Sequence, residues 1–365
     1  MNIQNFYILG FKMKKYQSWT ISFFILSFFL AISIIALNLK IDSFNLFNYT
    51  KLTIAKDLLN GYYISGENIS VNRVDNIYDP LLKNIEKIDI LAIGSSKTML
   101  LHKDILFKDK NPIYYNFTDG TARLKHYAKI LGLLNKYEIK YPSTIILGLD
   151  PWVFDQKASL TQIKALLNNT DKLNTNKYSQ LFNYEYTKLN LLSLFNQTIY
   201  NKSKRVSDLH IKTNKNMIIS PNGDIYYPVK ENNLTLDELL QNVQNNIQKC
   251  DQQNYDTKCV KYNKLTNFQE TKYLLTYLKN KNVNVVVYFA PFEPTFYDHI
   301  CKYNNFSKHY TKIKSFLRKN DINTIGSYNP HDLNLTSSLF LDSIHPNEKG
   351  IKKIFSKINL DIYIK

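Results

Sequence analysis

Arginine is scarce in this chain. Of the 365 residues, 47 are Lys or Arg, and only four of these are Arg. Proteins that read nucleic acids use Arg for its bidentate, stacking guanidinium group, and here no basic tract is interleaved with aromatic residues. Because Lys, Asn, Ile and Tyr are all abundant, as an AT-rich genome would produce, the formal charge of +17 is weak evidence for a polyanionic partner. We therefore expect no binding to nucleic acid.

Several familiar site motifs are missing as well. The chain has no G-x-G-x-x-G, no Walker-type G-x-x-x-x-G-K-S/T, no H-E-x-x-H and no G-x-S-x-G. Their absence removes the main evidence for a nucleotide-binding protein, a zinc protease or an ordinary α/β hydrolase. No C-x-x-C occurs, and no Cys/His spacing is typical of zinc. We expect neither a metal nor a cofactor.

Cysteine is also rare, with three residues in the chain. Cys250 and Cys259 bracket the polar stretch DQQNYDTK, and a disulfide could close so short a loop in an oxidising compartment. Cys301 would then be left single. The alternative is three unpaired thiols.

One long apolar run is present, from Trp19 to Leu37, and it holds nineteen residues without a charge or a Pro. In a helix it would cover about 28 Å, close to the hydrocarbon thickness of a bilayer. Three lysines lie among residues 12–15, and no acidic residue precedes Asp42. The positive-inside rule then predicts a cytoplasmic N-terminus (1–18), a transmembrane signal-anchor helix (19–39) and an extracytoplasmic remainder.

A cleavable signal peptide is the competing interpretation, particularly if Met13 were the start. The length of the run and the lack of a clear A-x-A site favour an uncleaved anchor in the inner, or cytoplasmic, membrane.

After a stalk and lead-in (40–80), which includes an expected helix over 49–60, short apolar runs alternate with helical patterns. This alternation is typical of an α/β domain with a parallel sheet, here over residues 81–365. The expected strands are 88–93, 113–117, 144–149, 283–289 and 323–327, and the expected helices are 124–135, 267–279 and 308–320. Residues 152–266 break the alternation and predict a large, mostly helical insertion, with helical pieces at 160–167 and 236–248 and a hairpin signal at 221–224.

Asp342 precedes His345 by three residues near the C-terminus. At that spacing the carboxylate can reach the imidazole Nδ1 and leave Nε2 outward as a base. The plainer interpretation is a surface pair at the start of a helix capped by Asn347.

Polar residues follow the first three expected strands, at the carboxyl edge where sites form in open α/β sheets. They are Gly94-Ser95-Ser96, Asn116 to Gly120, and Gly148-Leu149-Asp150. A Ser at the first turn can lie where backbone N–H groups favour an oxyanion, although small residues in a tight turn explain that stretch equally well.

Taken in this order, the blocks resemble the SGNH/GDSL hydrolase superfamily. Gly94-Ser95-Ser96 is similar to its first block, with Ser for Asp, and Asn116 to Gly120 resembles its second. Asp342-x-x-His345 is similar to its last, and the likeness covers roughly residues 85–365 apart from the insertion.

The resemblance implies a three-layer, flavodoxin-like parallel sheet. It also implies that Ser96 is the nucleophile, His345 the base and Asp342 the residue that orients it. The backbone amides of Ser96 and Gly120 would be oxyanion donors, with Asn116 in the same binding block.

The third block departs from the family pattern. It should supply an Asn that donates to the oxyanion, but this chain has Asp150. An ionised carboxylate only accepts hydrogen bonds, and losing such a donor costs about 10²–10³ in rate. Four interpretations are open. Asp150 is protonated, another group donates the missing hydrogen bond, Asp150 has a structural role, or the protein is not a fast hydrolase.

The resemblance to membrane-anchored members implies a bacterial cell-envelope enzyme: a serine esterase, or an O-acyltransferase acting on a glycan or polymer. Such proteins work beside a multi-spanning membrane O-acyltransferase. The alternative is a non-catalytic scaffold of the same fold that binds glycan or such a partner.

Overall fold

The computed structural model describes residues 3–41, 50–66, 73–120, 122–154, 159–168, 181–195, 204–206, 215–228, 234–251, 268–303, 306–356 and 358–363. The chain forms two compact units. The first joins Met1–Tyr49 to Leu173–Asn201, and the second joins Thr50–Lys172 to Lys202–Lys365.

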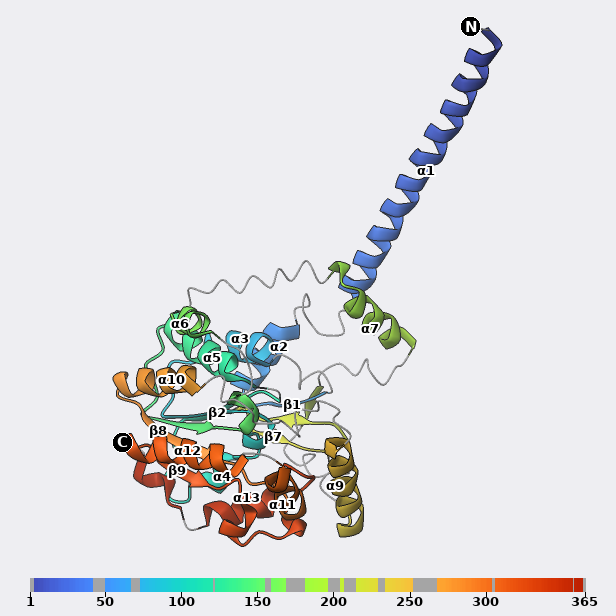
Figure 1. Cartoon of the computed structure of the whole chain (residues 1–365). Coiled ribbons are helices and arrows are strands. Elements are labelled where there is room, and N and C mark those ends of the chain that lie inside the picture. Colours follow the sequence, from blue (N-terminus) through green and yellow to red (C-terminus); the bar gives the residue numbers. More distant parts are fainter. Residues whose placement is uncertain are drawn as a thin grey trace. The chain divides into compact units, whose positions relative to one another are not determined.

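The second unit is built on a five-stranded parallel sheet (Figure 1). Its strands are β2 (Ile90–Gly94), β3 (Tyr114–Thr118), β4 (Thr144–Gly148), β8 (Asn284–Phe289) and β9 (Asn323–Gly326). They lie in the order β3-β2-β4-β8-β9, with every neighbouring pair parallel. By chain order this is 2-1-3-4-5, the order of flavodoxin-like sheets, in which the direction of winding reverses between the first and third strands.

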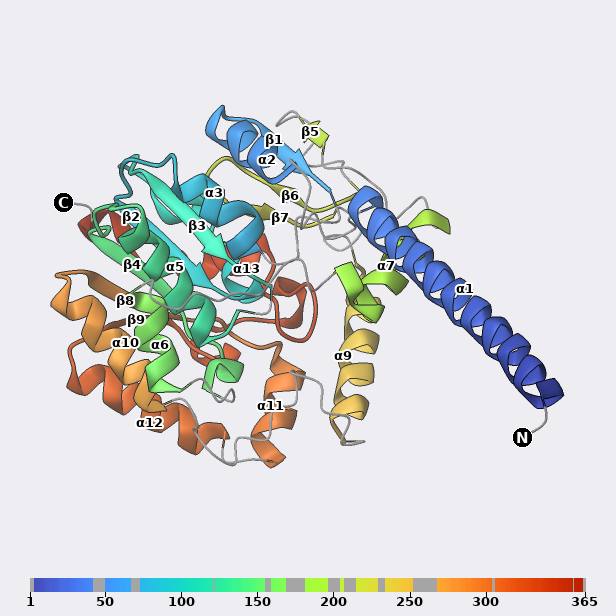
Figure 2. The ribbon, with the colours of Figure 1, turned by 90° about the horizontal axis from the view of Figure 1, so that it is seen from above.

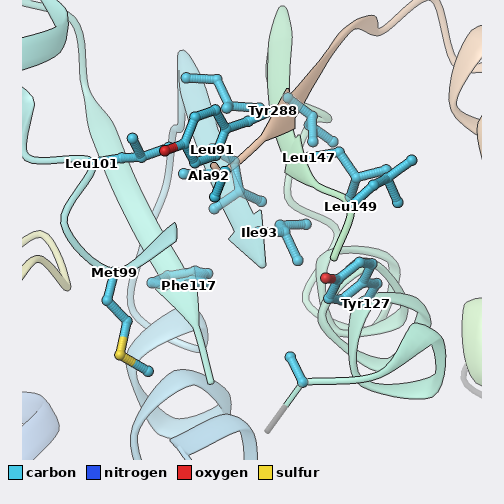
Figure 3. Packing of buried hydrophobic residues seen from close by; sticks show 14 of the residues in the cluster. Leu91, Ala92, Ile93, Met99, Leu101, Phe117, Tyr127, Leu147, Leu149 and Tyr288 are labelled. Atoms are coloured by element: carbon cyan, nitrogen blue, oxygen red, sulfur yellow. The ribbon is translucent and has the colours of Figure 1, made fainter. Parts of the chain in front are cut away.

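Helices cover both faces of this sheet. Figures 1 and 2 show α5, α6 and α10 on one face and α4, α12 and α13 on the other. The helices of this unit are α2 (Thr50–Leu59), α3 (Asp79–Leu82), α4 (Lys103–Leu106), α5 (Leu124–Lys136), α6 (Leu160–Leu167), α9 (Leu236–Asp251), α10 (Phe268–Asn280), α11 (Pro294–Tyr303), α12 (Phe306–Lys319) and α13 (Glu348–Phe355). All residues of β2 and β4 are buried, as expected for strands packed on both sides. Figure 3 shows Leu91, Ile93 and Leu147 of these strands among the packed side chains.

The α/β class and the parallel sheet predicted from the sequence are confirmed. Each expected strand lies within two residues of an observed one at either end, because a buried parallel strand carries an uninterrupted apolar run. The helices expected at 124–135, 267–279 and 308–320 correspond to α5, α10 and α12.

The insertion is neither one body nor purely helical. Its residues 173–201 belong to the first unit. Other parts supply three strands of a second sheet, β5 (Lys204–Val206), β6 (Ile218–Ile219) and β7 (Ile225–Tyr226). These strands join β1 (Tyr63–Ser65) in the antiparallel order β5-β1-β6-β7. The hairpin predicted at 221–224 is confirmed, because β6 and β7 pair antiparallel on either side of it. The strands β1 and β5 were not predicted, since strands of three residues are too short to show the alternation that identifies a strand in a sequence.

The first unit contains α1 (Ile3–Ile41) and α7 (Tyr184–Phe195). Residues Tyr16–Ile41 of α1 are long and apolar enough to cross a membrane, although a signal sequence has the same character. The predicted anchor, 19–39, falls inside this stretch. Cys259 lies outside the described residues, and its predicted pairing with Cys250 with it, whereas Cys301 is a free, half-buried cysteine.

Candidate active site

Ser96 lies at the turn that follows β2. It begins a short 3-10 helix, Ser96–Thr98, and the Ser95 side chain caps this helix by accepting from the Lys97 amide at 3.4 Å. Thr98 packs over the ends of two strands, where a Cβ on Gly94 or on Gly148 would lie 2.1 Å from its Oγ1. The two glycines therefore make room for the turn that presents Ser96.

His345 and Asp342 stand beside Ser96. The imidazole Nε2 is 2.8 Å from Ser96 Oγ, and Nδ1 is 2.8 Å from Asp342 Oδ2. Burial alone would raise the pKa of Asp342, but the charge of His345 and three hydrogen bonds outweigh burial and lower it. An ionised carboxylate only accepts, so the proton on His345 is at Nδ1, and Nε2 is free to accept from the Ser96 hydroxyl.

The backbone around His345 is fixed by the Asp342 carboxylate. Its Oδ1 accepts from the amides of Ile344 at 2.7 Å and of His345 at 2.9 Å. On the C-terminal side, the Asn347 side chain accepts from the amide of Gly350 at 3.0 Å and so caps α13. A Cβ on Gly350 would meet the Leu339 carbonyl oxygen at 2.4 Å, so glycine is required there.

The same loop is supported from α9 and from the turn after β8. Ser343, fully buried between His345 and Asp342, accepts from Asn246 Nδ2 of α9 at 2.7 Å. Its carbonyl oxygen accepts from the amide of Glu293 at 3.0 Å. Part of the insertion therefore helps to position the histidine loop.

Two backbone amides beside Ser96 have no hydrogen-bond acceptor among the residues that the structure describes. They belong to Ser96 and Gly120, the predicted oxyanion donors. A Cβ on Gly120 would have one neighbour within 4 Å, Met99 Cε at 3.8 Å, so space lies in front of this residue. Backbone N–H groups that lack an acceptor suit a developing negative charge when a substrate oxygen comes within reach.

The strand end that carries Gly120 is held by Arg73, a fully buried residue of the lead-in. Its amide donates to Asp119 Oδ2 at 3.2 Å, and its Nη1 donates to the Thr118 carbonyl oxygen at 3.2 Å. Tyr78 donates its hydroxyl to the same carbonyl, and burial raises the pKa of this phenol to about 12. These contacts fix the loop whose amide would bind an oxyanion.

Asp150, which stands where the resemblance calls for an Asn, is 1% exposed and accepts from the Ser95 hydroxyl. Burial raises its pKa, against the lowering effects of the Lys97 charge and the Ser95 hydrogen bond. Asp150 is therefore tied to Ser95, the residue that caps the turn carrying Ser96.

Lys97, the residue after Ser96, is also buried, at 1% exposure. Its Nζ donates to the Ala290 carbonyl oxygen at 2.9 Å and lies 3.6 Å from the ring centroid of Phe292, a cation–π contact. Burial lowers the pKa of the ammonium to about 8, while the charges of Asp150 and Asp342 act in the opposite direction. Lys97 thus provides a buried positive charge that offsets two carboxylates of the site.

Asn116, predicted to belong to the substrate-binding block, is directed elsewhere. It is fully buried, and its Nδ2 lies 3.3 Å from the carbonyl oxygens of Thr98, Met99 and Leu101. Its backbone amide donates to the Asn222 carbonyl oxygen at 2.7 Å, which pairs β3 with the turn between β6 and β7. Asn116 therefore holds the chain that follows the Ser96 turn, and its amide group is directed at these carbonyl oxygens.

Tyr227, which follows β7 of the insertion, lies close to His345. Its ring centroid is 6.2 Å from that of His345, and its hydroxyl contacts Met99 Sδ at 3.8 Å. Sequence reasoning missed Tyr227, Arg73 and Lys97. The only signal was the position of Lys97 directly after Ser96, and nothing in a chain so rich in Lys marks one as buried.

Among the described residues, no group of three or more His, Cys, Asp or Glu side chains is arranged to hold a metal ion. The chain matches no known family model, and no curated protein is detectably similar to it.

Proposed function

We propose that the chain is a membrane-anchored, extracytoplasmic serine esterase or O-acyltransferase of the SGNH type that acts on a cell-envelope glycan or polymer. The observation that carries the proposal is the hydrogen-bonded series Ser96–His345–Asp342, with 2.8 Å at each side-chain contact. Nucleophile, base and orienting carboxylate within hydrogen-bond reach are the signature of an activated serine.

In the first step Ser96 Oγ attacks the carbonyl carbon of an ester while His345 Nε2 takes the hydroxyl proton. The oxyanion forms beside the amides of Ser96 and Gly120. His345 then gives the proton to the departing alcohol oxygen, and the acyl group stays on Ser96. An incoming hydroxyl, from water or from a glycan, gives its proton to His345 as its oxygen attacks the acyl carbon. His345 then passes this proton to Ser96 Oγ as the bond between Ser96 and the acyl group breaks.

The experiment is labelling of the purified full chain with a fluorophosphonate probe. We expect one adduct, located on Ser96 by peptide mass spectrometry, and its loss in Ser96→Ala. Ser338→Ala, which removes an exposed serine, is the matched control and should label like the wild type. Equal labelling of Ser96→Ala and wild type would remove Ser96 as the nucleophile.

Transfer and hydrolysis are separated by a second measurement. The acyl-enzyme formed from an activated acetyl ester is offered an oligosaccharide in water, and the products are analysed by mass spectrometry. Acetylated oligosaccharide supports an acyltransferase, whereas acetate alone supports an esterase.

A non-catalytic envelope scaffold is the second candidate, and Asp150 favours it. A buried carboxyl occupies the position at which the resemblance expects an oxyanion donor. The scaffold predicts no labelling at Ser96 and unchanged glycan binding in Ser96→Ala.

A further inference from the structure

Helix α7 is joined to the end of α1 by a buried polar contact. Asn38, with no exposed surface, donates from Nδ2 to the Leu181 carbonyl oxygen at 2.8 Å and to Thr187 Oγ1 at 2.9 Å. Its Oδ1 accepts from Asn190 Nδ2 at 2.8 Å, and Asn190 is also fully buried. The two helices lie side by side at this end of α1 (Figure 1). This part of the insertion therefore binds the apolar helix specifically.

The contact covers one face of α1 only. Among residues 16–41, the side chains that are at least partly buried are Ala31, Ile34, Ile35, Leu37, Asn38 and Ile41. Most of them recur at spacings of three or four, which places them on one helical face. Asn38 is the first residue after the uncharged run Trp19–Leu37. If this run crosses a bilayer, α7 binds where the hydrocarbon region ends.

The opposite side of α7 exposes apolar side chains. Tyr186 and Asn190 are buried, whereas Tyr184, Leu191 and Leu192 are 74%, 41% and 45% exposed. Phe182, just before the helix, is 65% exposed. Outside α1, these are four of the nine exposed large hydrophobic side chains among the described residues, gathered within eleven positions of the chain.

The exposed face of α7 also carries Lys188, one turn from Tyr184 and from Leu191. Tyr and Leu with an intervening Lys are suited to the boundary between headgroups and acyl chains, where the rings and aliphatic groups are buried and the ammonium reaches water. A face turned only to water would expose these side chains at a cost.

We propose that α7 lies in the membrane interface beside the C-terminal end of α1, with Phe182, Tyr184, Leu191 and Leu192 against lipid. The insertion then contributes a second, peripheral membrane contact to the anchor. This inference rests on the proposed anchoring of the chain by α1.

The test uses the full chain in nanodiscs of phosphatidylcholine and phosphatidylglycerol. A clickable amino acid carrying an environment-sensitive fluorophore replaces one residue at a time: Leu191 on α7, Phe28 in the middle of the apolar run, or Gln241, an exposed residue of α9. Each label is quenched with lipids that carry a nitroxide either near the headgroup or near the bilayer centre.

For Leu191 we expect strong quenching by the shallow nitroxide, at least about threefold that of Gln241, and weaker quenching by the deep one. Phe28 should be quenched mainly by the deep nitroxide. If Phe28 behaves so while the Leu191 label is as unquenched as the Gln241 label, the interfacial position of α7 is overturned and the anchoring stands. If the fluorophore at Leu191 reports an apolar environment only when a partner protein is added, the exposed face of α7 binds protein and not lipid. This result also overturns the proposal. If the Phe28 label is unquenched, the anchoring itself fails.

A paired variant tests the face directly. Leu191→Gln with Leu192→Gln should lower shallow quenching of a label at Tyr184 about threefold, while fluorophosphonate labelling of Ser96 stays at the wild-type level. Unchanged quenching would contradict a lipid contact through these leucines.

Discussion

His345 Nε2 lies 2.8 Å from Ser96 Oγ, although 249 residues separate the two along the chain. Ser96 follows β2 and His345 precedes α13, so the contact depends on the sheet and on the loop that α9 supports. An Asp–His pair that only stabilises the start of a helix does not require contact with a serine at the switch point of a parallel sheet. The pair is therefore better explained as part of a site than as a helix-start contact.

The first prediction concerns the orienting carboxylate. Asp342→Asn should lower ester turnover about 10³–10⁴-fold with little change in KM, because the imidazole would no longer be held in the tautomer that accepts from Ser96. Turnover of an activated acetyl ester measures this. A variant that keeps wild-type turnover would show that Asp342 serves only the loop, and Asp104→Asn, an exposed carboxyl of α4, is the control.

The second prediction is a dependence of stability on pH. The pKa of Asp342 is lower in the folded chain than in the unfolded one, so its ionised form stabilises the fold above its unfolded pKa of about 3.9. This contribution is lost as the pH falls below that value toward the folded pKa. The Tm of the full chain in detergent should therefore fall more steeply between about pH 5 and pH 3 for wild type than for Asp342→Asn. Parallel curves would contradict the coupling of Asp342 to His345.

The third prediction concerns two buried charged residues near Ser96, Lys97 and Asp150. Lys97→Met should reduce the free energy of unfolding by about 3 kcal/mol, because the buried carboxyl of Asp150 loses the cation that offsets it. Combining it with Asp150→Asn should recover at least about half of that loss, since the amide carries no charge. Denaturant unfolding of the wild type, the two single variants and the double variant gives the coupling energy between Lys97 and Asp150. If the changes in the free energy of unfolding were strictly additive, Lys97 would act through its contacts with Ala290 and Phe292 alone.

The fourth prediction compares two glycines at strand ends. Gly120→Ala should change the free energy of unfolding by less than about 1 kcal/mol, since the nearest atom to the new methyl is Met99 Cε at 3.8 Å. It should nevertheless lower turnover about 10- to 100-fold by occupying the space before the amide. Gly94→Ala should be clearly destabilising, because its methyl would lie 2.1 Å from Thr98 Oγ1. Turnover and Tm measured on both variants separate the two roles.

The central sheet was predictable because its strands are buried on both faces and read as unbroken apolar runs. Asp342 and His345 stand out in the sequence by their three-residue spacing before a helix, whereas the choice of Ser96 came from the resemblance of Gly94-Ser95-Ser96 to a family block. Arg73 and Lys97 were not predictable, since nothing local distinguishes a buried cation from an exposed one. Asn116 was assigned by its place in a motif, whereas its partners are backbone carbonyl oxygens that only the folded chain brings to it.

The contact between Asn38 and Asn190 has a consequence for biosynthesis. The partners of the Asn38 side chain follow it by 143 to 152 residues. At about 5–20 residues per second, translation takes roughly 10–30 s to reach them. During that interval the apolar helix has already been made, and the Asn38 side-chain amide has to form its hydrogen bonds with other groups. The contact between α1 and α7 is therefore completed only after more than half of the chain has been synthesised, so a truncation before Leu181 would leave Asn38 without these polar partners.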